Sequence, residues 1–300
     1  MQGYGMNKMN LLEEIKIFLK DKGFRYSVQM RSGSYVICVT TLDGHHQRVI
    51  LPLEIEAGSQ EEAVRQSEMA TESILLTETY DRMYPLVITR DRWERQREMM
   101  EKRLLAHLEL FLPIYARNCE VRKIDKGVAR EFLERNHSYG HAACRHCYGL
   151  FFKRHTGHIA ETMGGTSSED KPGTMMAVAT FSNARKWVKG DRTIRSYEWT
   201  RYASLPEVRL SGGMGKMMKA FIKDVGPDDI MSYADLEWSK GDVYGQLGFE
   251  LEGTKSPVMF AVDGDWRRFP VKPGMTEENG IKYFLNFGSR KYRLKLTDYQ

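Results

Sequence analysis

The sequence predicts an α/β protein that begins with a small α+β region. Residues 1–84 combine an amphipathic helix with a hairpin of two β-branched runs, a pairing typical of a small α+β unit. From residue 119 onward, strand-like and helix-like runs alternate, as they do in α/β domains. We therefore expect a small α+β domain over 1–84, a connecting helix over 85–118 and an α/β domain over 119–300.

The first elements are predicted from local patterns. Apolar residues recur at i, i+4 and i+7 from Leu11 onward, which predicts a helix that Gly23 ends through a left-handed cap. Strands are expected over residues 35–41 and 47–55, because the Asp43-Gly44 pair between them suits a tight turn. None of these elements predicts a chemical role for the region.

Two further helices are predicted before residue 118. Ser59 stands three residues before Glu62, which indicates a capping box that opens a helix to about Thr79. Residues 89–111 keep one apolar face, and on the other face opposite charges at i and i+4 neutralise one another. We interpret this run as a connecting helix that ends before Pro113, with a nucleic-acid-binding face as the alternative.

The alternation after residue 119 predicts most of the later elements. The glycine-rich and serine-rich run 155–173 predicts a turn-rich insertion between strands. Strands are expected over 119–124, 148–153, 175–181, 195–202, 230–236, 258–262 and 281–287, and helices over 128–135, 210–223 and 242–247.

Composition narrows the class of protein. The chain is 300 residues long with a net charge of +5, and residues 119–300 hold 29 basic against 23 acidic residues. This excess favours an anionic partner such as nucleic acid or a phosphorylated cofactor, or else it is an ordinary slightly basic surface. Four cysteines suggest free thiols in a reducing cytoplasm, and the absence of a long apolar run predicts no membrane span.

A glycine-rich loop is the most informative motif. Arg209-Leu-Ser-Gly-Gly-Met-Gly-Lys216 lies between a predicted strand and a predicted helix. Glycines let a ligand approach the backbone, and a helix start offers unpaired N–H groups to an anion such as a pyrophosphate. The spacing matches neither the Walker loop nor the dinucleotide-binding fingerprint, so a simple structural turn is the alternative. The residues that this motif assigns to a cofactor are Arg209, Ser211, Gly212, Gly213, Gly215 and Lys216.

The loop resembles a signature of the acyl-CoA-dependent N-acetyltransferase (GNAT) family, R/Q-x-x-G-x-G/A at a helix start. Met214 departs from the small residue expected at the last position. About thirty residues on, the run 243–249 looks like the family's second signature, a Tyr before Gly-Phe, and Tyr244 is the matching position. The resemblance implies a mixed sheet with flanking helices, acetyl-CoA or a related acyl-CoA as donor, and Tyr244 as general acid toward the departing thiolate.

A closer resemblance covers about residues 130–262. In order, Asn136-His137-x-x-Gly140, Tyr148-Gly-Leu-Phe151, Ala177-Val-Ala-Thr-Phe181, Glu198-x-x-Arg201, the glycine loop and Ser232-Tyr-Ala-Asp-x-x-Trp238 look like the Mom-like branch of phage and mobile-element DNA-modification proteins. That branch implies transfer of a small acyl-derived group to the exocyclic amine of adenine in DNA. The first 118 residues lie outside it.

An amine acceptor requires a base, which we expect to be a carboxylate. Asp235, at the end of a strand, is the first choice and Glu198 the second; as the alternative, Asp235 caps the turn that follows it. Arg201 is expected to meet a phosphate or Glu198, although an i, i+3 pair on a regular strand faces opposite sides. Ser232 and Tyr233 line the same region or belong to a strand interior.

Histidines and cysteines raise the question of a metal. Asn136 and His137 either cap a helix or face the substrate, and His45 and His46 are either turn residues or metal ligands. We expect no metal in the later group, because zinc favours a second ligand pair well separated in sequence and adjacent His and Cys cannot easily reach one ion. That group is His137, His141, Cys144, His146 and Cys147.

The basic run 289–295 is expected to form a strand with charges on both faces. It either contacts phosphates or is a charged edge strand that prevents aggregation.

These observations favour a GNAT-like N-acyltransferase that modifies an amine, with an amino group of a DNA base as one target. Two alternatives remain: an acetyltransferase acting on a protein or small-molecule amine, and a non-catalytic DNA-binding accessory protein of a mobile element. The sequence leaves the oligomeric state open.

Overall fold

The computed structural model describes residues 9–153 and 173–299, which fall into two compact units. The first unit comprises residues 1–109, 234–240 and 254–289, and the second comprises the remaining segments from 110 to 300. Segments 234–240 and 254–289 therefore group with the N-terminal part, whereas the predicted domain 119–300 included both. Long-range packing decides this grouping, and local periodicity carries no information about it.

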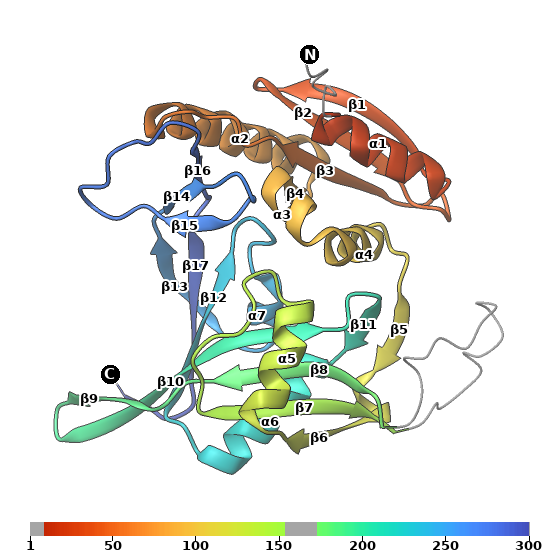
Figure 1. The fold of residues 1–300 in the computed structure, drawn as a ribbon. Coiled ribbons are helices and arrows are strands. Elements are labelled where there is room, and N and C mark those ends of the chain that lie inside the picture. Colours follow the sequence, from red (N-terminus) through yellow and green to blue (C-terminus); the bar gives the residue numbers. More distant parts are fainter. Residues whose placement is uncertain (1–8, 154–172, 300) are drawn as a thin grey trace. The chain divides into compact units, whose positions relative to one another are not determined.

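The first unit is built on a four-stranded sheet in the order β1-β2-β3-β4, with helices beside it (Figure 1). The predicted first helix, hairpin turn and capping box are confirmed: Leu11 is fully buried, Gly44 has φ of 78°, and Ser59 Oγ accepts from the Glu62 amide at 3.2 Å. A second sheet, β15-β14-β16, completes the unit. Its elements are α1 (Leu11–Asp21), β1 (Arg25–Arg31), β2 (Ser34–Thr40), β3 (Gln47–Leu53), α2 (Gln60–Asp81), β4 (Leu86–Thr89), α3 (Arg90–Arg95), α4 (Arg97–His107), β14 (Met259–Val262), β15 (Arg268–Pro270) and β16 (Lys282–Leu285).

The predicted single helix over 89–111 is wrong. The chain forms β4, then α3 and α4, which are separated at Gln96 (φ −127°, ψ 35°). Charges that the helical pattern assigned to solvent are buried instead, because distant carboxylates pair with them. Arg90 lies 2.6 Å from Glu14 and 3.1 Å from Glu54. The sequence spacing of Arg90 gives no sign of these partners.

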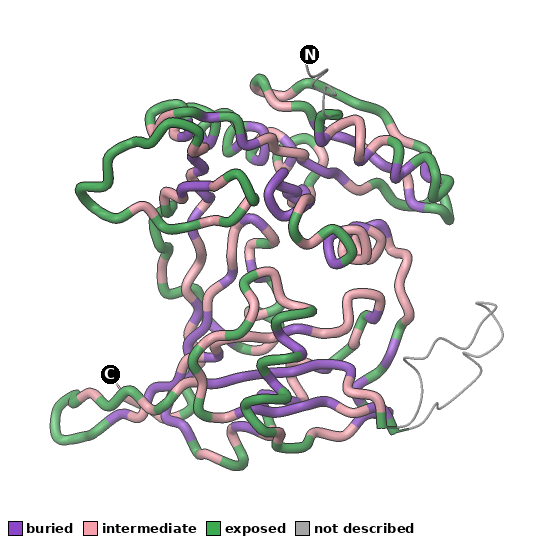
Figure 2. Tube along the Cα trace, viewed as in Figure 1, coloured by how far each residue is buried: buried purple, intermediate pink, exposed green. Residues whose placement is uncertain are grey.

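The second unit contains the predicted mixed sheet with flanking helices, so the expected fold class is confirmed. Strand order is β13-β17-β12-β10-β8-β7-β6, and β9 pairs with β10. The central strands β7 and β8 are largely buried (Figure 2). The elements are β5 (Leu112–Tyr115), η1 (Ala116–Asn118), β6 (Cys119–Lys123), α5 (Lys126–Asn136), β7 (His146–Phe152), β8 (Met175–Phe181), β9 (Arg185–Lys189), β10 (Arg192–Ser204), β11 (Val208–Ser211), α6 (Gly213–Val225), β12 (Asp229–Asp235), α7 (Asp242–Gln246), β13 (Glu250–Lys255) and β17 (Ser289–Lys295).

Helices cover both faces of this sheet. Val178 of β8 packs in the same core cluster as Leu133 of α5. Phe181, three residues along the same strand, stacks on Phe221 of α6 with ring centroids 3.8 Å apart. Because alternate residues of a strand point to opposite faces, α5 and α6 lie on opposite sides of the sheet.

Three further outcomes concern the predicted elements. The insertion predicted over 155–173 lies outside the described residues except at its last residue. The edge-strand alternative for 289–295 is wrong, because β17 lies between β13 and β12, and Arg293 pairs with Glu252 at 2.8 Å and with Asp229 at 2.7 Å. None of the described helices is long and apolar enough to cross a bilayer.

Candidate functional site

The sheet divides between two parallel strands, β10 and β12. Their register runs from Ser196↔Asp229 to Glu198↔Met231 and stops there, although both strands continue. Ser232 bridges the first step of the division, because its Oγ donates to the carbonyl oxygen of Trp199 at 3.1 Å. We call this division the split. In open α/β sheets, ligands bind beyond the carboxyl ends of parallel strands, where neighbouring strands part.

The glycine loop forms the start of α6. Gly212 has φ of 77° and precedes the helix as its N-cap, without a side chain to bond the first-turn amides. The amide of Lys216 closes the first turn on the carbonyl of Gly212 at 3.0 Å. Because the first N–H groups of a helix have no carbonyl one turn back, the amides of Gly213, Met214 and Gly215 have no acceptor within α6.

At two glycines of this loop, a side chain would crowd neighbouring residues of the protein. A Cβ at Gly213 would lie 3.0 Å from Leu210 Cβ and 3.1 Å from the Tyr202 hydroxyl, and one at Gly215 would lie 3.2 Å from Leu247 Cδ2. Gly212 is exposed, and a Cβ there would meet Ala116 only at 3.7 Å. Gly212 is therefore the position where a ligand can approach the backbone.

The side chains predicted to bind the cofactor differ in how exposed they are and in what they contact. Arg209 is exposed, with its guanidinium 5.1 Å from the centre of the Phe111 ring, and Ser211 is exposed beside it. Lys216 Nζ donates to the carbonyls of Ala116 at 2.8 Å and Cys119 at 2.6 Å. Lys216 thus anchors the segment before β6, whereas Arg209 and Ser211 are accessible at the helix start.

Tyr244 lies on α7 with its hydroxyl directed to the split. That hydroxyl is 2.8 Å from Ser232 Oγ, and the ring stacks on Tyr292 with centroids 5.1 Å apart. Burial raises the pKa of the Tyr244 hydroxyl, so it is protonated at neutral pH. Leu247, at the end of α7, contacts the first turn of α6 near Gly215. The structure therefore brings the second signature to both the split and the glycine loop.

Sequence reasoning missed two aromatic residues beside Tyr244. The ring of Trp199 meets Tyr244 edge-on at 6.5 Å, and Tyr292 stacks on it from β17. Tyr292 follows Tyr244 by 48 residues on a strand whose position in the sheet has no local signal. Trp199 had a weak signal, because it follows Glu198 directly in the strand already singled out.

Glu198 and Arg201 lie on the same face of β10, contrary to the sequence expectation. The register with β8 shifts between Trp199 and Arg201, which marks a β-bulge. A bulge adds one residue, so positions i and i+3 point the same way. Burial lowers the pKa of the Arg201 guanidinium, and the charge of Glu198 acts in the opposite direction. Arg201 Nε also donates to the carbonyl of Gly140 at 3.1 Å, which ties the split to the loop after α5.

Asp235 has the geometry of the capping alternative. Its Oδ1 accepts from the Glu237 amide at 2.9 Å, and its backbone carbonyl accepts from the amide of Trp238 at 3.0 Å. Its other oxygen lies 3.8 Å from Arg92, and the residue groups with the first unit. Ser232 and Tyr233 both belong to β12 in the second unit, where Ser232 contacts Tyr244 directly.

Asn136 and His137 end α5. Asn136 Nδ2 donates to the carbonyl of Phe132 at 2.9 Å, and His137 Nδ1 accepts from the Tyr139 amide at 3.1 Å. These contacts are those of a helix C-terminus. Gly140, whose amide bonds the carbonyl of His137 at 2.8 Å, is the residue through which this loop meets Arg201.

The later histidines and cysteines have separate partners. His141 Nδ1 lies 2.6 Å from Glu134, His146 meets the ring of Phe221 at 5.6 Å, and the sulfurs of Cys144 and Cys147 are 3.4 Å apart.

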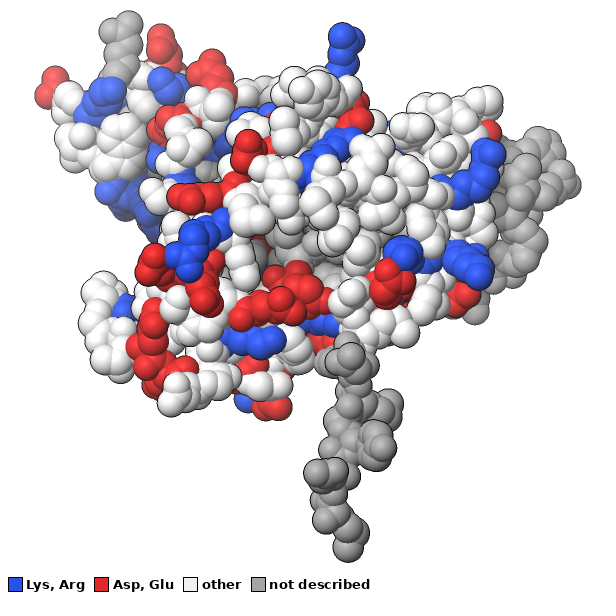
Figure 3. All heavy atoms as spheres, turned by 90° about the horizontal axis from the view of Figure 1, so that it is seen from above, with Lys and Arg blue, Asp and Glu red and all other residues white. Residues whose placement is uncertain are grey.

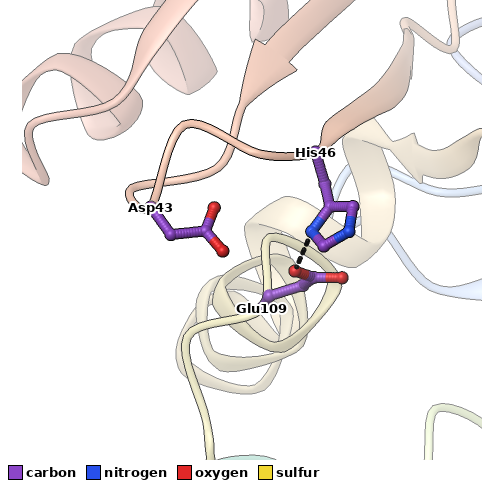
Figure 4. A group of neighbouring side chains, drawn as sticks. All are labelled: Asp43, His46 and Glu109. Carbon is purple, nitrogen blue, oxygen red and sulfur yellow. Dashed lines mark hydrogen bonds and ion pairs between the residues drawn. The ribbon is translucent and has the colours of Figure 1, made fainter.

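One group with metal-ligand chemistry occurs elsewhere, at the hairpin tip of the first unit. Asp43, His46 and Glu109 have ligand atoms within 4.8 Å of one another (Figure 4). His46 Nδ1 lies 2.9 Å from Glu109, and Arg48 pairs with the other oxygen of that carboxylate. The Glu109 carboxylate is thus already neutralised by a protein cation.

Acidic and basic side chains are interspersed on the face of the molecule drawn in Figure 3.

The chain was compared with protein-family models, curated proteins and solved structures. No protein-family model matches the chain, and no curated protein matches it. Among solved structures, it is similar to a conserved protein of unknown function from Enterococcus faecalis described as a probable N-acyltransferase, at 13% identity and a TM-score of 0.32 over 48% of this chain and 35% of the other. The chain thus spans about a third of that protein's length.

Two more solved structures are acetyltransferases. A GNAT-family acetyltransferase from Bacillus anthracis is 10% identical with a TM-score of 0.29, over 59% of this chain and 95% of the other. The histone acetyltransferase HPA2 and related acetyltransferase of Corynebacterium glutamicum is 10% identical with a TM-score of 0.30, over 81% of this chain and 95% of the other. At these TM-scores the likeness is partial.

Proposed function

We propose that the second unit is an acyl-CoA-dependent N-acyltransferase. One observation carries the proposal: the α6 start, whose first amides have no acceptor within α6, contacts the helix that holds the Tyr244 hydroxyl at the split. The donor set suits a diphosphate, because first-turn amides and the helix dipole favour negative charge and Gly212 leaves the backbone accessible. Arg209 and Ser211 are the exposed side chains that can add bonds there.

Two residues at the split, Glu198 and Tyr244, move protons in this reaction. Acyl-CoA, when bound, supplies an acyl carbonyl on a sulfur leaving group. Glu198 accepts the proton that the acceptor amine loses as its nitrogen bonds the carbonyl carbon. Tyr244 donates its proton to the sulfur as the carbon–sulfur bond breaks, so that an amide and a free thiol result. Tyr244 suits this task because burial raises its pKa.

Glu198 replaces Asp235 as our first choice of base. The Asp235 carboxylate accepts from the Glu237 amide, so it is held in a turn that groups with the first unit. Glu198 lies at the last paired position before the split and is partly exposed, with Arg185 3.8 Å from its carboxylate. A base must reach the acceptor, which a partly exposed carboxylate at the split can do.

As the acceptor, we propose an amino group of a DNA base. The ordered residue resemblance over about 130–262 supports this choice, as does the excess of positive charge after residue 119. A base within a duplex must leave the stack before its exocyclic amine can react.

The proposal that acyl-CoA binds at the start of α6 is tested by blocking that helix start. Ser211→Glu places a carboxylate beside the α6 amides, where it competes with a diphosphate without harming the helix. We expect acetyl-CoA binding, measured by titration calorimetry, to weaken at least about tenfold. Ser256→Glu, at an exposed position of the first unit, is the control and should bind as the wild type does. Equal affinities in the two variants would contradict the donor site.

The proposal that a DNA base accepts the acyl group is tested in cells. The protein is expressed in a bacterium, and digested DNA nucleosides are compared by mass spectrometry with those from cells expressing Tyr244→Phe. A modified adenine nucleoside present only with the wild type is expected. An unmodified profile with intact acetyl-CoA binding would point to a protein or small-molecule amine, and DNA binding without acetyl-CoA binding would point to a non-catalytic accessory protein.

A further inference from the structure

The strands β9 and β10 form a basic ribbon that the reaction described above does not use. β9 (Arg185–Lys189) pairs with the first part of β10 from Arg192 to Ser196, and the two strands extend beyond the sheet of the second unit (Figure 1). Residues 185–195, which we call the arm, contain five basic residues and one acidic residue. These are Arg185, Lys186, Lys189, Arg192, Arg195 and Asp191.

Like charges face each other across the arm. Arg192 is directly opposite Lys189, and Arg195 is directly opposite Lys186. Because Arg192 and Arg195 are three residues apart on a regular strand, one such pair lies on each face. Like charges directly opposite each other destabilise a hairpin, so these two pairs lower the stability of the arm. A partner rich in negative charge would relieve that repulsion.

The arginines and the lysines of the arm differ in what balances them. Asp228 lies 3.6 Å from both Arg192 and Arg195, and it accepts from the Arg195 amide at 2.8 Å, so it fixes the base of the arm. Lys186 and Lys189 are exposed, and within the described part of the chain neither has an ion pair. The lysine charges are therefore available to an external anion.

The arm has a rigid base. Trp187 is opposite Ile194, which is fully buried, and the Trp187 ring meets Tyr299 edge-on at 5.4 Å. Three residues after Arg195 the same strand reaches Glu198, and Arg185 lies 3.8 Å from that carboxylate. A chain of phosphates held along the arm would thus lead to the split.

We propose that the arm is the docking element for the phosphate backbone of duplex DNA. A two-stranded ribbon has the width that a DNA groove admits, and lysines on both of its faces meet the phosphates on either side. A linear polymer of regularly spaced charges can meet the exposed lysines on both faces of the arm. This inference rests on the proposed function for its link to a base amine, and its test does not depend on catalysis.

The test compares two double variants with the wild type. Lys186→Gln with Lys189→Gln removes the available charges of the arm. Lys219→Gln with Lys223→Gln removes two exposed lysines of α6 and is the matched control. Binding to a labelled 20-base-pair duplex is measured by fluorescence anisotropy between about 50 and 200 mM salt. We expect the arm variant to lower the slope of log K against log salt by about 1.8, and the control to leave it unchanged.

Two further readouts separate the possible failures. The arm variant should unfold at the same temperature as the wild type or slightly higher, because two like-charge pairs are removed. Acetyl-CoA binding, measured on the same samples, should be unchanged. Loss of acetyl-CoA binding in all proteins, with DNA binding intact, would refute the proposed function and leave the arm inference standing.

Three results would overturn the inference. They are a wild type that does not bind the duplex at 50 mM salt, equal slopes for the wild type and the arm variant, and displacement of the duplex by polyglutamate at the same charge concentration. The last would show that the arm accepts any polyanion and has no preference for DNA.

Discussion

The hydroxyl of Tyr244 lies 2.8 Å from Ser232 Oγ, which itself donates to the carbonyl oxygen of Trp199 at 3.1 Å. Because a serine hydroxyl has a single hydrogen, Tyr244 must be the donor in the first of these bonds. These two hydrogen bonds place the Tyr244 hydroxyl at the first step of the split. Trp199 and Ser232 are thus positioning residues for the proposed acid.

Tyr244→Phe should separate catalysis from binding. Removing the hydroxyl takes away the proton donor, so we expect kcat for acyl transfer to fall about 100-fold or more. Acetyl-CoA affinity should stay within about twofold, because the donor site is on α6. Steady-state kinetics and calorimetry measure the two quantities. A variant with undiminished kcat would show that the leaving thiolate needs no acid from this position.

Gly213→Ala should destabilise the protein. The added Cβ would lie 3.0 Å from Leu210 Cβ and 3.1 Å from the Tyr202 hydroxyl, so the loop must shift. We expect a loss of about 1–3 kcal/mol in the free energy of unfolding, measured with urea. Gly127→Ala in α5 is the control, because a Cβ there has no atom within 4 Å, and it should stabilise by up to about 1 kcal/mol. The prediction fails if both variants gain stability.

Local signals were sufficient for most of the fold. The capping box of Ser59 and Glu62 and the turn at Gly44 depend on residues within four positions of one another, and both were predictable. The central strand Met175–Phe181 was predicted with the observed bounds, because strands buried on both faces read as continuous apolar runs. The glycine loop and Tyr244 were recognisable because each belongs to a signature of neighbouring residues in the sequence.

Features set by distant partners were not predictable. The chain breaks the predicted helix at Gln96, and Arg90 before it is buried against Glu14 and Glu54, which come from other segments. Asp235 groups with the first unit as part of segment 234–240, whereas Tyr233 belongs to the second unit. β9 is a strand despite its charges, and it has only Trp187 and Val188 as local strand signals. The bulge that places Glu198 and Arg201 together is likewise a property of strand pairing.

Asp228 should make stability depend on pH in the acidic range. The Arg195 amide donates to its carboxylate, which lowers the pKa of Asp228 in the folded protein. The pKa of this carboxyl is therefore lower in the folded protein than its value of about 3.9 in the unfolded chain. The resulting stabilisation is complete above about pH 3.9, and it is lost as the pH falls through the folded-state pKa. The difference in unfolding free energy between wild type and Asp228→Asn should therefore shrink below about pH 4.

Urea unfolding at a series of pH values from neutral to about 3 measures this difference. Asp191→Asn, at the exposed turn of the arm, is the matched control, and its stability should follow that of the wild type at every pH. A difference for Asp228→Asn that persists undiminished at the lowest pH would show that the carboxylate is not the group responsible.

Cys147 should be unreactive in the folded protein. Burial raises the pKa of its thiol to about 12, and only 6% of the residue is exposed. The thiolate, which is the species that reacts with iodoacetamide, is therefore scarce at pH 8. We expect mass spectrometry to find Cys147 unmodified under native conditions and fully modified in guanidinium. Rapid native alkylation would instead indicate a redox or metal-binding role for the pair with Cys144.

Arg268 should be the most sensitive single position of the first unit. Its guanidinium lies 2.5 Å from Asp91 and 2.8 Å from Glu237, and both carboxylates are buried. Arg268→Met would leave two buried negative charges without this cation, which costs about 3–5 kcal/mol when a buried pair is broken. Arg267→Met is the control one residue away, because that side chain is 56% exposed and lies 3.8 Å from Asp265. It should change the unfolding free energy by less than about 0.5 kcal/mol. Replacing all members of a buried charge cluster can be neutral, so the triple variant Arg268→Met, Asp91→Asn, Glu237→Gln should regain much of the lost unfolding free energy. A triple variant as unstable as Arg268→Met would show that packing of the Arg268 side chain, and not its charge, stabilises the unit.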